Sequence, residues 1–314
     1  MRYRLGHGFA LATAIVLGTQ ASPQATAERY VKQKLCREVA QDFAQIKVRG
    51  ASTLEVNNTL FEATRHGCLK LARRLINNGA SLRARDRTGA MPLSRAAVEG
   101  WTKLVAEYLN LGAPIDARDT QGSTALFHAA AFERLDVVKL LLKRGADIAI
   151  PGRKGNTIIA AAAYRGNKDM VELLLKKGAD PMIMDRFGKA PMCYAAGRGF
   201  TRVVRVLLDG GVNVNARYGN GLSALIWAAG YSVDAGSLDA LDVINLLISR
   251  GARIDDRDNR GRTALMIAAE LEHGEVVEAL LKRGADPSLV DKQGKSAHDL
   301  APTKELRAKL AANP

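Results

Sequence analysis

The stretch DTQGSTALFHAAAFERLDVVKLLLKRGA, residues 119–146, decides the fold of this 314-residue chain because its parts recur along the sequence. Its opening turn, Asp-x-x-Gly or a close variant, begins at seven positions spaced 33, 33, 33, 33, 40 and 33 residues apart. The turns begin at Asp86, Asp119, Gly152, Asp185, Tyr218, Asp258 and Asp291. A repeat of this period indicates a solenoid of stacked supersecondary units, and such stacks form extended binding faces.

Each unit predicts a pair of helices joined by tight turns. In the quoted unit Thr124 is placed to cap a first helix that carries Ala129-Ala130. A second helix carries Leu141-Leu142 and ends at Gly145-Ala146, because a Gly just past the last apolar residue marks a helix C-terminus. The corresponding caps in other units are Thr157, Ser223, Thr263 and Ser296.

This order of residues resembles the ankyrin repeat, and the resemblance extends from 86 to 301. It implies an all-α repeat solenoid, in which helix-turn-helix units are linked by extended hairpin loops. The sequence departs from the family pattern where Gly152 and Tyr218 replace the first Asp, and where Glu133 and Glu272 replace the central Gly. We expect each departure to cost about 1 kcal/mol or less in cap or turn energy.

The repeat also sets the domain boundaries. The repeat domain is predicted over 53–314, with a degenerate first unit at 53–85, full units from 86, and a truncated cap at 291–314. Residues 28–52 precede it and predict an amphipathic helix that closes the stack. The apolar side of that helix is expected to carry Val31, Leu35, Val39, Phe43 and Ile46.

The first 27 residues have the layout of a secretory signal peptide. Arg2 and Arg4 precede a short apolar run, and Ala25-Thr26-Ala27 offers a small-x-small cleavage site. We expect cleavage after Ala27, with Ala21 as the second choice, and a periplasmic or secreted protein. The alternative is an uncleaved amphipathic N-terminus.

The three cysteines do not form a disulfide framework, because their number is odd and they are sparse. In an exported protein, a Cys36–Cys68 bridge would staple the N-terminal helix to the first repeat. The alternative is that each cysteine is a small buried apolar residue. Cys193 lies in an Ala-rich helix and is expected to serve packing.

The 40-residue interval contains seven additional residues between the two helices of its unit, within 230–239. Insertions of this kind map to loops and are tolerated at low entropic cost. A contact loop over Tyr231–Asp239 and a neutral insertion are both open interpretations.

The sequence contains no catalytic constellation. None of its five His has a Cys or His at metal-ligand spacing, and His128 is expected to be a hydrogen-bonded interior residue. The Gly-x-x-Gly turns lack the Lys-Ser/Thr of a phosphate loop, and there is no Gly-x-Ser-x-Gly elbow. We therefore predict no enzyme activity, no metal and no cofactor.

Charge is the feature that points to a partner. The chain has a formal net charge of +14, and removal of Arg2 and Arg4 would leave 14 − 2 = +12. The ankyrin resemblance implies that ligands contact the turn tips and the exposed side of the first helix, and these positions are rich in Arg, Lys and aromatic residues. The predicted partner-binding residues are Arg87, Arg118, Phe132, Arg153, Lys154, Tyr164, Arg186, Phe187, Lys189, Tyr231, Arg260 and Arg262.

These features predict a monomeric, non-enzymatic module that binds an acidic protein partner through a basic concave face. An inhibitor or immunity-type cap and a scaffold or stabiliser are both compatible with the sequence. The alternative is a binder of anionic envelope surfaces such as lipid or lipopolysaccharide, which implies weak membrane association. Nucleic acid is not expected as a partner, because an exported chain with no nucleic-acid motif does not favour it.

Overall fold

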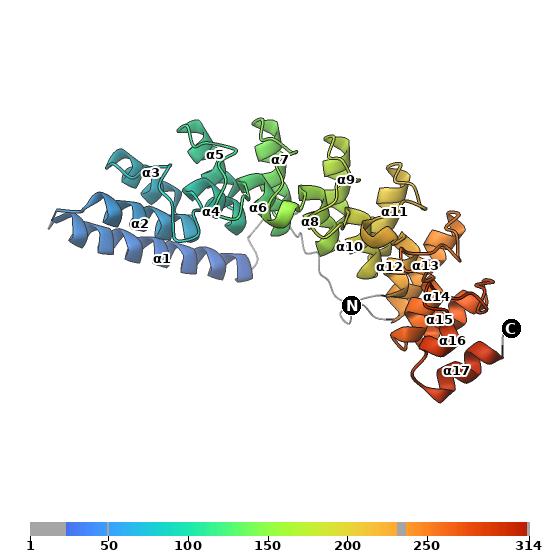
Figure 1. The fold of residues 1–314 in the computed structure, drawn as a ribbon. Helices are drawn as coiled ribbons and strands as arrows, with labels where there is room; N and C mark the ends of the chain where they lie inside the picture. The colour runs from blue at the N-terminus through green and yellow to red at the C-terminus, as the bar shows by residue number, and fades with distance from the viewer. Residues whose placement is uncertain (1–22, 49, 231–236, 313–314) are drawn as a thin grey trace, which may run out of the picture.

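The computed structural model describes residues 23–48, 50–230 and 237–312, and in these ranges the chain is an array of helix pairs (Figure 1). The pairs stack in chain order into a curved array, in which one helix of each pair lies along the outer edge and the other lies beneath it. The prediction of an all-α repeat solenoid is confirmed: within the described ranges the elements are helices, and no strand is present.

The first helices of the units form the inner row. They are α2 (Thr53–Arg65), α4 (Pro92–Glu99), α6 (Ala125–Ala131), α8 (Ile158–Arg165), α10 (Pro191–Gly197), α12 (Ala224–Ala229), α14 (Ala264–Glu270) and α16 (Ala297–Leu300). Successive inner helices pack against one another, and the Ala-Ala pairs of α4 to α14 are fully buried between them. Alanine permits this close approach because its side chain ends at Cβ.

The second helices form the outer row. They are α3 (Leu69–Asn77), α5 (Thr102–Asn110), α7 (Leu135–Lys143), α9 (Lys168–Lys176), α11 (Thr201–Asp209), α13 (Ser237–Ser249), α15 (Gly274–Leu281) and α17 (Lys304–Ala311). Their Val and Leu side chains point into the gap between the rows; Val138, Leu141 and Leu174, for example, are fully buried. At about 1.5–3 kcal/mol for each buried Val or Leu, this layer is the main hydrophobic contribution.

Helix starts follow the expected capping pattern. The hydroxyl of Thr124 accepts a hydrogen bond from the Phe127 N–H, and the equivalent Thr or Ser begins α8, α12, α14 and α16 in the same way. Ser52 begins α2 with a full capping box, in which Glu55 reaches back to the Ser52 N–H. The caps are therefore built locally, within four residues of sequence.

The turn aspartates each organise the loop that follows them. One carboxylate oxygen accepts the backbone N–H groups two and four residues later, as Asp119 does from Gln121 at 2.8 Å and Ser123 at 2.9 Å. Asp86, Asp185, Asp258 and Asp291 repeat this arrangement. Backbone bonds tie five of the six successive pairs of turn tips, such as Arg186 N–H to the Lys154 carbonyl at 3.0 Å.

The unit at 152 lacks this aspartate for a packing reason. A side chain at Gly152 would collide with the Phe127 ring, since an added Cβ would lie 2.7 Å from it. Phe127 is buried and thus occupies the space that an Asp side chain uses in other units. The Arg153 N–H, whose counterpart Arg186 N–H bonds a carbonyl of the preceding tip, here donates to the Ser123 hydroxyl at 3.2 Å.

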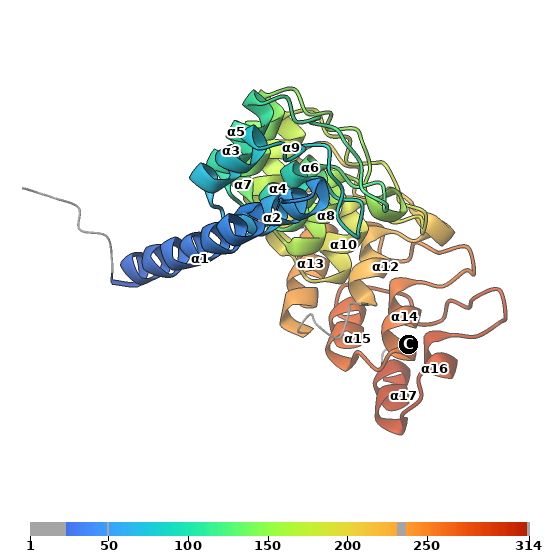
Figure 2. The same cartoon turned by 90° about the vertical axis from the view of Figure 1, so that its left-hand side faces the viewer.

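The N-terminal helix α1 (Pro23–Val48) packs on α2 and extends beyond the start that the sequence predicted. The preferred cleavage point after Ala27 therefore falls within α1, whereas residues 1–22 of the predicted signal peptide lie outside the described ranges. Phe43 is buried against the stack, but Val31 is 55% exposed, so the apolar side of the helix is narrower than predicted. In Figure 2, α1 extends to the left and the loops between units extend to the right.

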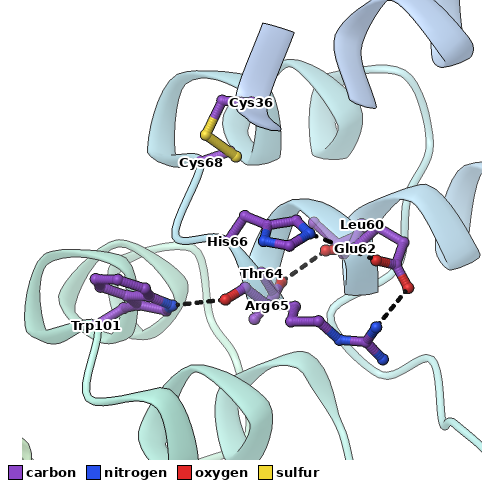
Figure 3. Close-up of a disulfide and its surroundings, with 8 residues drawn as sticks. All are labelled: Cys36, Leu60, Glu62, Thr64, Arg65, His66, Cys68 and Trp101. Atoms are coloured by element: carbon purple, nitrogen blue, oxygen red, sulfur yellow. Dashed lines mark hydrogen bonds and ion pairs between the residues drawn. A yellow bond between two sulfur atoms is a disulfide. The ribbon is translucent and has the colours of Figure 1, made fainter. Parts of the chain in front are cut away.

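A disulfide joins Cys36 of α1 to Cys68 at the start of α3 (Figure 3). Beside it, the Trp101 indole N–H donates to the Arg65 carbonyl at 3.0 Å, and the Lys32 ammonium lies 3.7 Å from the centre of the Trp101 ring. Burial, together with the nearby Lys103, lowers the pKa of Lys32. The bridge and this cation–π contact link α1 to the first two units.

The seven additional residues do not form a simple loop. Residues 231–236, including Tyr231, lie outside the described ranges, but α13 has 13 residues where α9 and α11 have 9. Within the added turn Leu238 is 74% exposed and Ala240 is buried. Gly199 accommodates the turn, because a Cβ there would lie 2.5 Å from the Asp239 Cβ.

We predict that replacing both bridging cysteines by serine releases α1 without unfolding the central units. The bridge closes a separation of 32 residues, and a disulfide of this kind stabilises by about 2–4 kcal/mol. Hydrogen exchange followed by mass spectrometry should show faster exchange in α1 and unchanged exchange in α6 to α12. Unchanged protection of α1 would show that its packing on α2 suffices.

A second prediction concerns Glu272, which adopts a left-handed backbone with φ of 60° where other units have Gly, as at Gly100. Glu272→Gly should raise the urea midpoint, by a stabilisation of up to about 1 kcal/mol, because glycine accepts this conformation without steric cost. Glu275→Gly, in the first turn of α15, is the matched control and should lower the midpoint. Equal decreases in both variants would contradict the argument.

Candidate binding surface

At three of the five turn aspartates, the side chain nine residues later reaches back from the inner helix and binds the carboxylate. Arg95 donates to Asp86, and the hydroxyl of Tyr194 donates to Asp185. His128 lies 2.8 Å from Asp119, which agrees with the interior hydrogen-bonded role expected for this histidine. The turns and the inner helices are thereby fixed to each other.

These contacts shift the ionisation of the partners. Burial opposes the charge of Asp119, but hydrogen bonds from His128 and from the backbone of Ser123 and Gln121 outweigh it and hold its pKa below the ordinary value. Burial, followed by the hydrogen bond to Asp185, raises the pKa of Tyr194. Asp119 therefore stays charged and Tyr194 stays neutral near pH 7.

Aromatic and basic side chains gather on the inner helices of the units at 152, 185 and 218. The rings of Tyr164 and Tyr194 meet edge to face, with 5.7 Å between their centres. The Arg198 guanidinium lies 4.5 Å from the Tyr164 ring centre, and the Lys189 ammonium lies 4.9 Å from that of Trp227. We call Tyr164, Lys189, Tyr194, Arg198 and Trp227 the aromatic–basic strip.

Lys189 connects the strip, because its ammonium also lies 5.7 Å from the Tyr194 ring centre. The strip therefore runs without interruption from α8 through α10 to α12. The indole N–H of Trp227 is buried and has no hydrogen-bond acceptor among the residues that the structure describes.

A second pair of predicted residues meets at the turn tips. The Lys154 ammonium lies 4.8 Å from the centre of the Phe187 ring, which is 60% exposed. Lys154 itself is exposed, as are its neighbour Arg153 and Arg186 of the next tip. Two adjacent tips thus present three cations and one apolar ring to solvent.

Other predicted residues are exposed but belong to the units at 86, 119 and 258. They are Arg87, Arg118, Phe132 and Arg260, and they offer separate positive or apolar points. Tyr231 lies outside the described ranges.

Arg262 does not belong to the surface, because its charge is used inside the unit. Its guanidinium binds Asp258 and Glu270, each at 3.0 Å, and its side chain is 19% exposed. Arg85 and Arg217, two further tip arginines, donate to backbone carbonyl groups of their own turn and of the next unit. Counting basic residues in the sequence therefore overstates the charge available to a partner.

Sequence reasoning missed Tyr194, Arg198 and Trp227. A signal for two of them existed: Tyr194 and Trp227 stand nine residues after their turn starts, at the position that Arg95 and His128 occupy. Which of these positions form ring and cation contacts depends on how neighbouring units stack, and the sequence pattern does not show that.

The described ranges contain neither a helix long and apolar enough to cross a bilayer nor a cluster of three or more His, Cys, Asp or Glu that could hold a metal. Cys193 is buried, and burial raises the pKa of its thiol to about 12. Its thiolate is therefore scarce at neutral pH, which leaves Cys193 a packing residue.

Stacked helix pairs with an open surface across several units define a repeat solenoid of the binding type. Residues 60–152, 157–258 and 220–291 match the family model of ankyrin repeats and cover more than half of the chain. The chain belongs to the ankyrin repeat family, whose members generally mediate protein–protein interaction and are typically non-enzymatic.

Similarity to individual proteins is confined to short stretches. Ankyrin repeat domain-containing protein 63 of human and of mouse is 42% identical over 53 residues, which is 17% of this chain and 14% of each relative. Ankyrin repeat protein L92 of Acanthamoeba polyphaga mimivirus is 33% identical over 84 residues, 27% of this chain and 19% of the relative. The chain thus spans less than a fifth of these relatives.

We predict that Asp86→Asn lowers stability at neutral pH by about 1 kcal/mol, because the ion pair with Arg95 is lost while an acceptor remains. Burial opposes the charge of Asp86, but the bonds from Arg95 and Thr88 lower its folded-state pKa below the ordinary 3.8. Its contribution is thus present above the unfolded-state pKa and is lost as pH falls through the folded-state value.

Thermal unfolding from about pH 3 to 7 measures this dependence. The difference in unfolding midpoint between Asp86→Asn and the wild type should be largest above about pH 5 and should shrink in acid. A difference that is constant over the whole range would show that the charge of Asp86 does not matter.

Proposed function

We propose that this chain is an exported, non-enzymatic interaction module that binds an acidic protein partner through its aromatic–basic strip and the adjoining tips. The observation that carries the proposal is the uninterrupted run from Tyr164 to Trp227 across three consecutive units. Tyr, Trp and Arg are the residue types that dominate binding energy at protein interfaces.

The strip suits an acidic partner for two reasons. Lys189 lies against the Tyr194 and Trp227 rings, so it is positioned before a carboxylate arrives and loses little conformational freedom on binding. The net charge of +14 would in addition speed the encounter with an acidic protein.

Export is supported by the signal-like first 27 residues and by the Cys36–Cys68 bridge, since disulfides persist in oxidising compartments. We infer a periplasmic or secreted protein. Within that compartment the module acts as an inhibitor or immunity-type cap, or as a scaffold that stabilises its partner. Fractionation and N-terminal sequencing test export, and an intact Met1 in the cytosol would overturn it.

Binding to an anionic envelope surface is the second candidate, and the net charge favours it. It predicts co-sedimentation with phosphatidylglycerol vesicles that falls steeply with salt. A discrete protein partner predicts retention at about 150 mM salt, where exposed charges farther apart than roughly 8 Å are screened.

We predict that one variant with four charge reversals no longer captures a discrete acidic protein from an extract of the source organism. The reversals are Arg153→Glu, Lys154→Glu, Arg186→Glu and Lys189→Glu. Each reversal replaces attraction by repulsion, so affinity should fall by at least about a hundredfold. Affinity is measured by surface plasmon resonance with the captured protein.

The matched control reverses the same number of charges on the outer helices, at Lys139, Lys143, Arg202 and Arg205, which are exposed. This variant should keep the partner. If both variants lose it equally, net charge acts alone and the strip is not the site; if neither loses it, the basic face has no part in binding.

A further inference from the structure

Two polar ladders tie neighbouring loops together along most of the stack. We call the segment from the end of each outer helix to the next turn a finger. In the first ladder, a side-chain oxygen three residues before the turn accepts a backbone N–H of the next finger. Asp116, Asn215 and Asp255 accept from Asp147, Arg253 and Asp286 at 3.1, 2.9 and 3.1 Å.

The second ladder uses the residue directly before the turn. Arg85 donates to the Arg118 carbonyl at 2.8 Å, and Arg257 donates to the Val290 carbonyl at 3.1 Å. Arg217 makes the same bond to the Arg257 carbonyl. The fingers at these places are thus joined by side chains as well as by backbone.

Among the described residues, neither ladder has a bond that starts from the fingers leading into Gly152 and into Asp185. In the finger that leads into Asp185, the three positions before the turn hold Met182, Ile183 and Met184, where the next finger has Asn215, Ala216 and Arg217. A thioether is a weak acceptor and has no N–H to donate. Met182 therefore cannot replace the acceptor of the first ladder, and Met184 cannot replace the donor of the second. The finger before it, with Ala149, Ile150 and Pro151, lacks the polar side chains as well.

The apolar side chains that stand at these positions are exposed to solvent and not buried. Met182, Ile183 and Met184 are 40%, 43% and 43% exposed, and Phe187 at the tip of the same finger is 60% exposed. We call these four residues the finger patch. Scattered exposed apolar residues need no explanation, but four within six positions are typical of an interaction surface.

The fold does not need the finger patch for its own cohesion. The backbone bond from Arg186 to the Lys154 carbonyl ties this tip to the preceding one at 3.0 Å, and Gly219 N–H bonds the Gly188 carbonyl at 2.8 Å on the other side. The tips therefore remain in register, while their side chains are available to a partner.

Charge next to the patch indicates what covers it. The Lys154 ammonium lies 4.8 Å from the Phe187 ring, and exposed Arg186 stands between Met184 and Phe187 in the sequence. An apolar surface flanked by cations complements a segment that carries apolar side chains beside acidic ones. Met suits such a surface, because its flexible thioether adapts to the shape of the bound side chain.

We propose that the finger patch is the apolar anchor of the binding surface, and that it takes a protein segment in which large apolar side chains are flanked by Asp or Glu. This inference rests on the proposed function and adds a specificity to it: acidity alone does not define the partner. The patch selects for apolar side chains, whereas the aromatic–basic strip selects for charge.

The chain itself supplies a variant that removes the patch and keeps the fold. This ladder-restored variant combines Met182→Asn, Ile183→Ala and Met184→Arg. It copies residues 215–217 of the next finger and is designed to restore both ladders. The variant gains one positive charge. Electrostatics alone would therefore tighten the binding of an acidic ligand, whereas loss of an apolar anchor weakens it.

The test is selection of random 12-residue peptides displayed on phage, with the wild-type chain as bait and the ladder-restored variant for counter-selection. We expect enriched peptides to combine large apolar residues with flanking Asp or Glu. Synthetic copies should bind the wild type at least about tenfold more tightly than the ladder-restored variant by fluorescence anisotropy. Replacing their apolar residues by Ser should remove that difference.

Failure of this inference is distinguishable from failure of the proposed function. One outcome is that acidic peptides bind the wild type and the ladder-restored variant equally but do not bind the fourfold Glu variant. That outcome would overturn the finger patch and leave the proposed function standing. Apolar peptides without acidic residues would overturn the proposed chemistry of the segment. The absence of any enrichment on the wild type over the ladder-restored variant would also overturn the patch.

Discussion

Close contact between successive inner helices is the constraint on which the rest of the structure depends. The buried Ala-Ala pairs of α4 to α14 bring these helices together, and the interval of 33 residues follows from repeating that contact. A unit cannot bury its own apolar face, so each unit supplies half of the interface that the next one needs. The single interval of 40 is absorbed without breaking the row, because part of it lengthens α13 at the point where Gly199 leaves room.

A second level of order comes from the turn aspartates and the residues that reach them. Asp86, Asp119 and Asp185 make the same backbone bonds, yet their partners nine residues later are Arg95, His128 and Tyr194. The position is not confined to one residue type, since the other units hold Ala161, Trp227, Ile267 and Leu300 there. It can therefore also contribute to the surface, as Tyr194 does in the aromatic–basic strip.

The units at 152, 185 and 218 differ from the others in where their polar groups go. At other fingers, Arg, Asn and Asp side chains form hydrogen bonds to the backbone of the next finger. These bonds strengthen the stack and reduce the charge that is available to a partner. In the middle of the stack the fingers that lead into Gly152 and Asp185 carry apolar residues, and Lys154, Lys189 and Arg198 lie against aromatic rings. This region therefore presents apolar side chains and cations next to each other, and a partner can use both.

The sequence by itself determined the helix pairs, the caps and the family, because those features arise from short spacings such as Thr124 to Ala129-Ala130. It also indicated Lys154, Tyr164, Phe187 and Lys189 as surface residues. Only the tertiary structure decided that Arg262 is neutralised within its unit, and that Arg198 and Trp227 join the strip. The physical reason is that a side chain acquires its role from the neighbours that the folded chain places beside it. Those neighbours lie within the same unit for Arg262, and in the adjacent unit for Arg198 and Trp227.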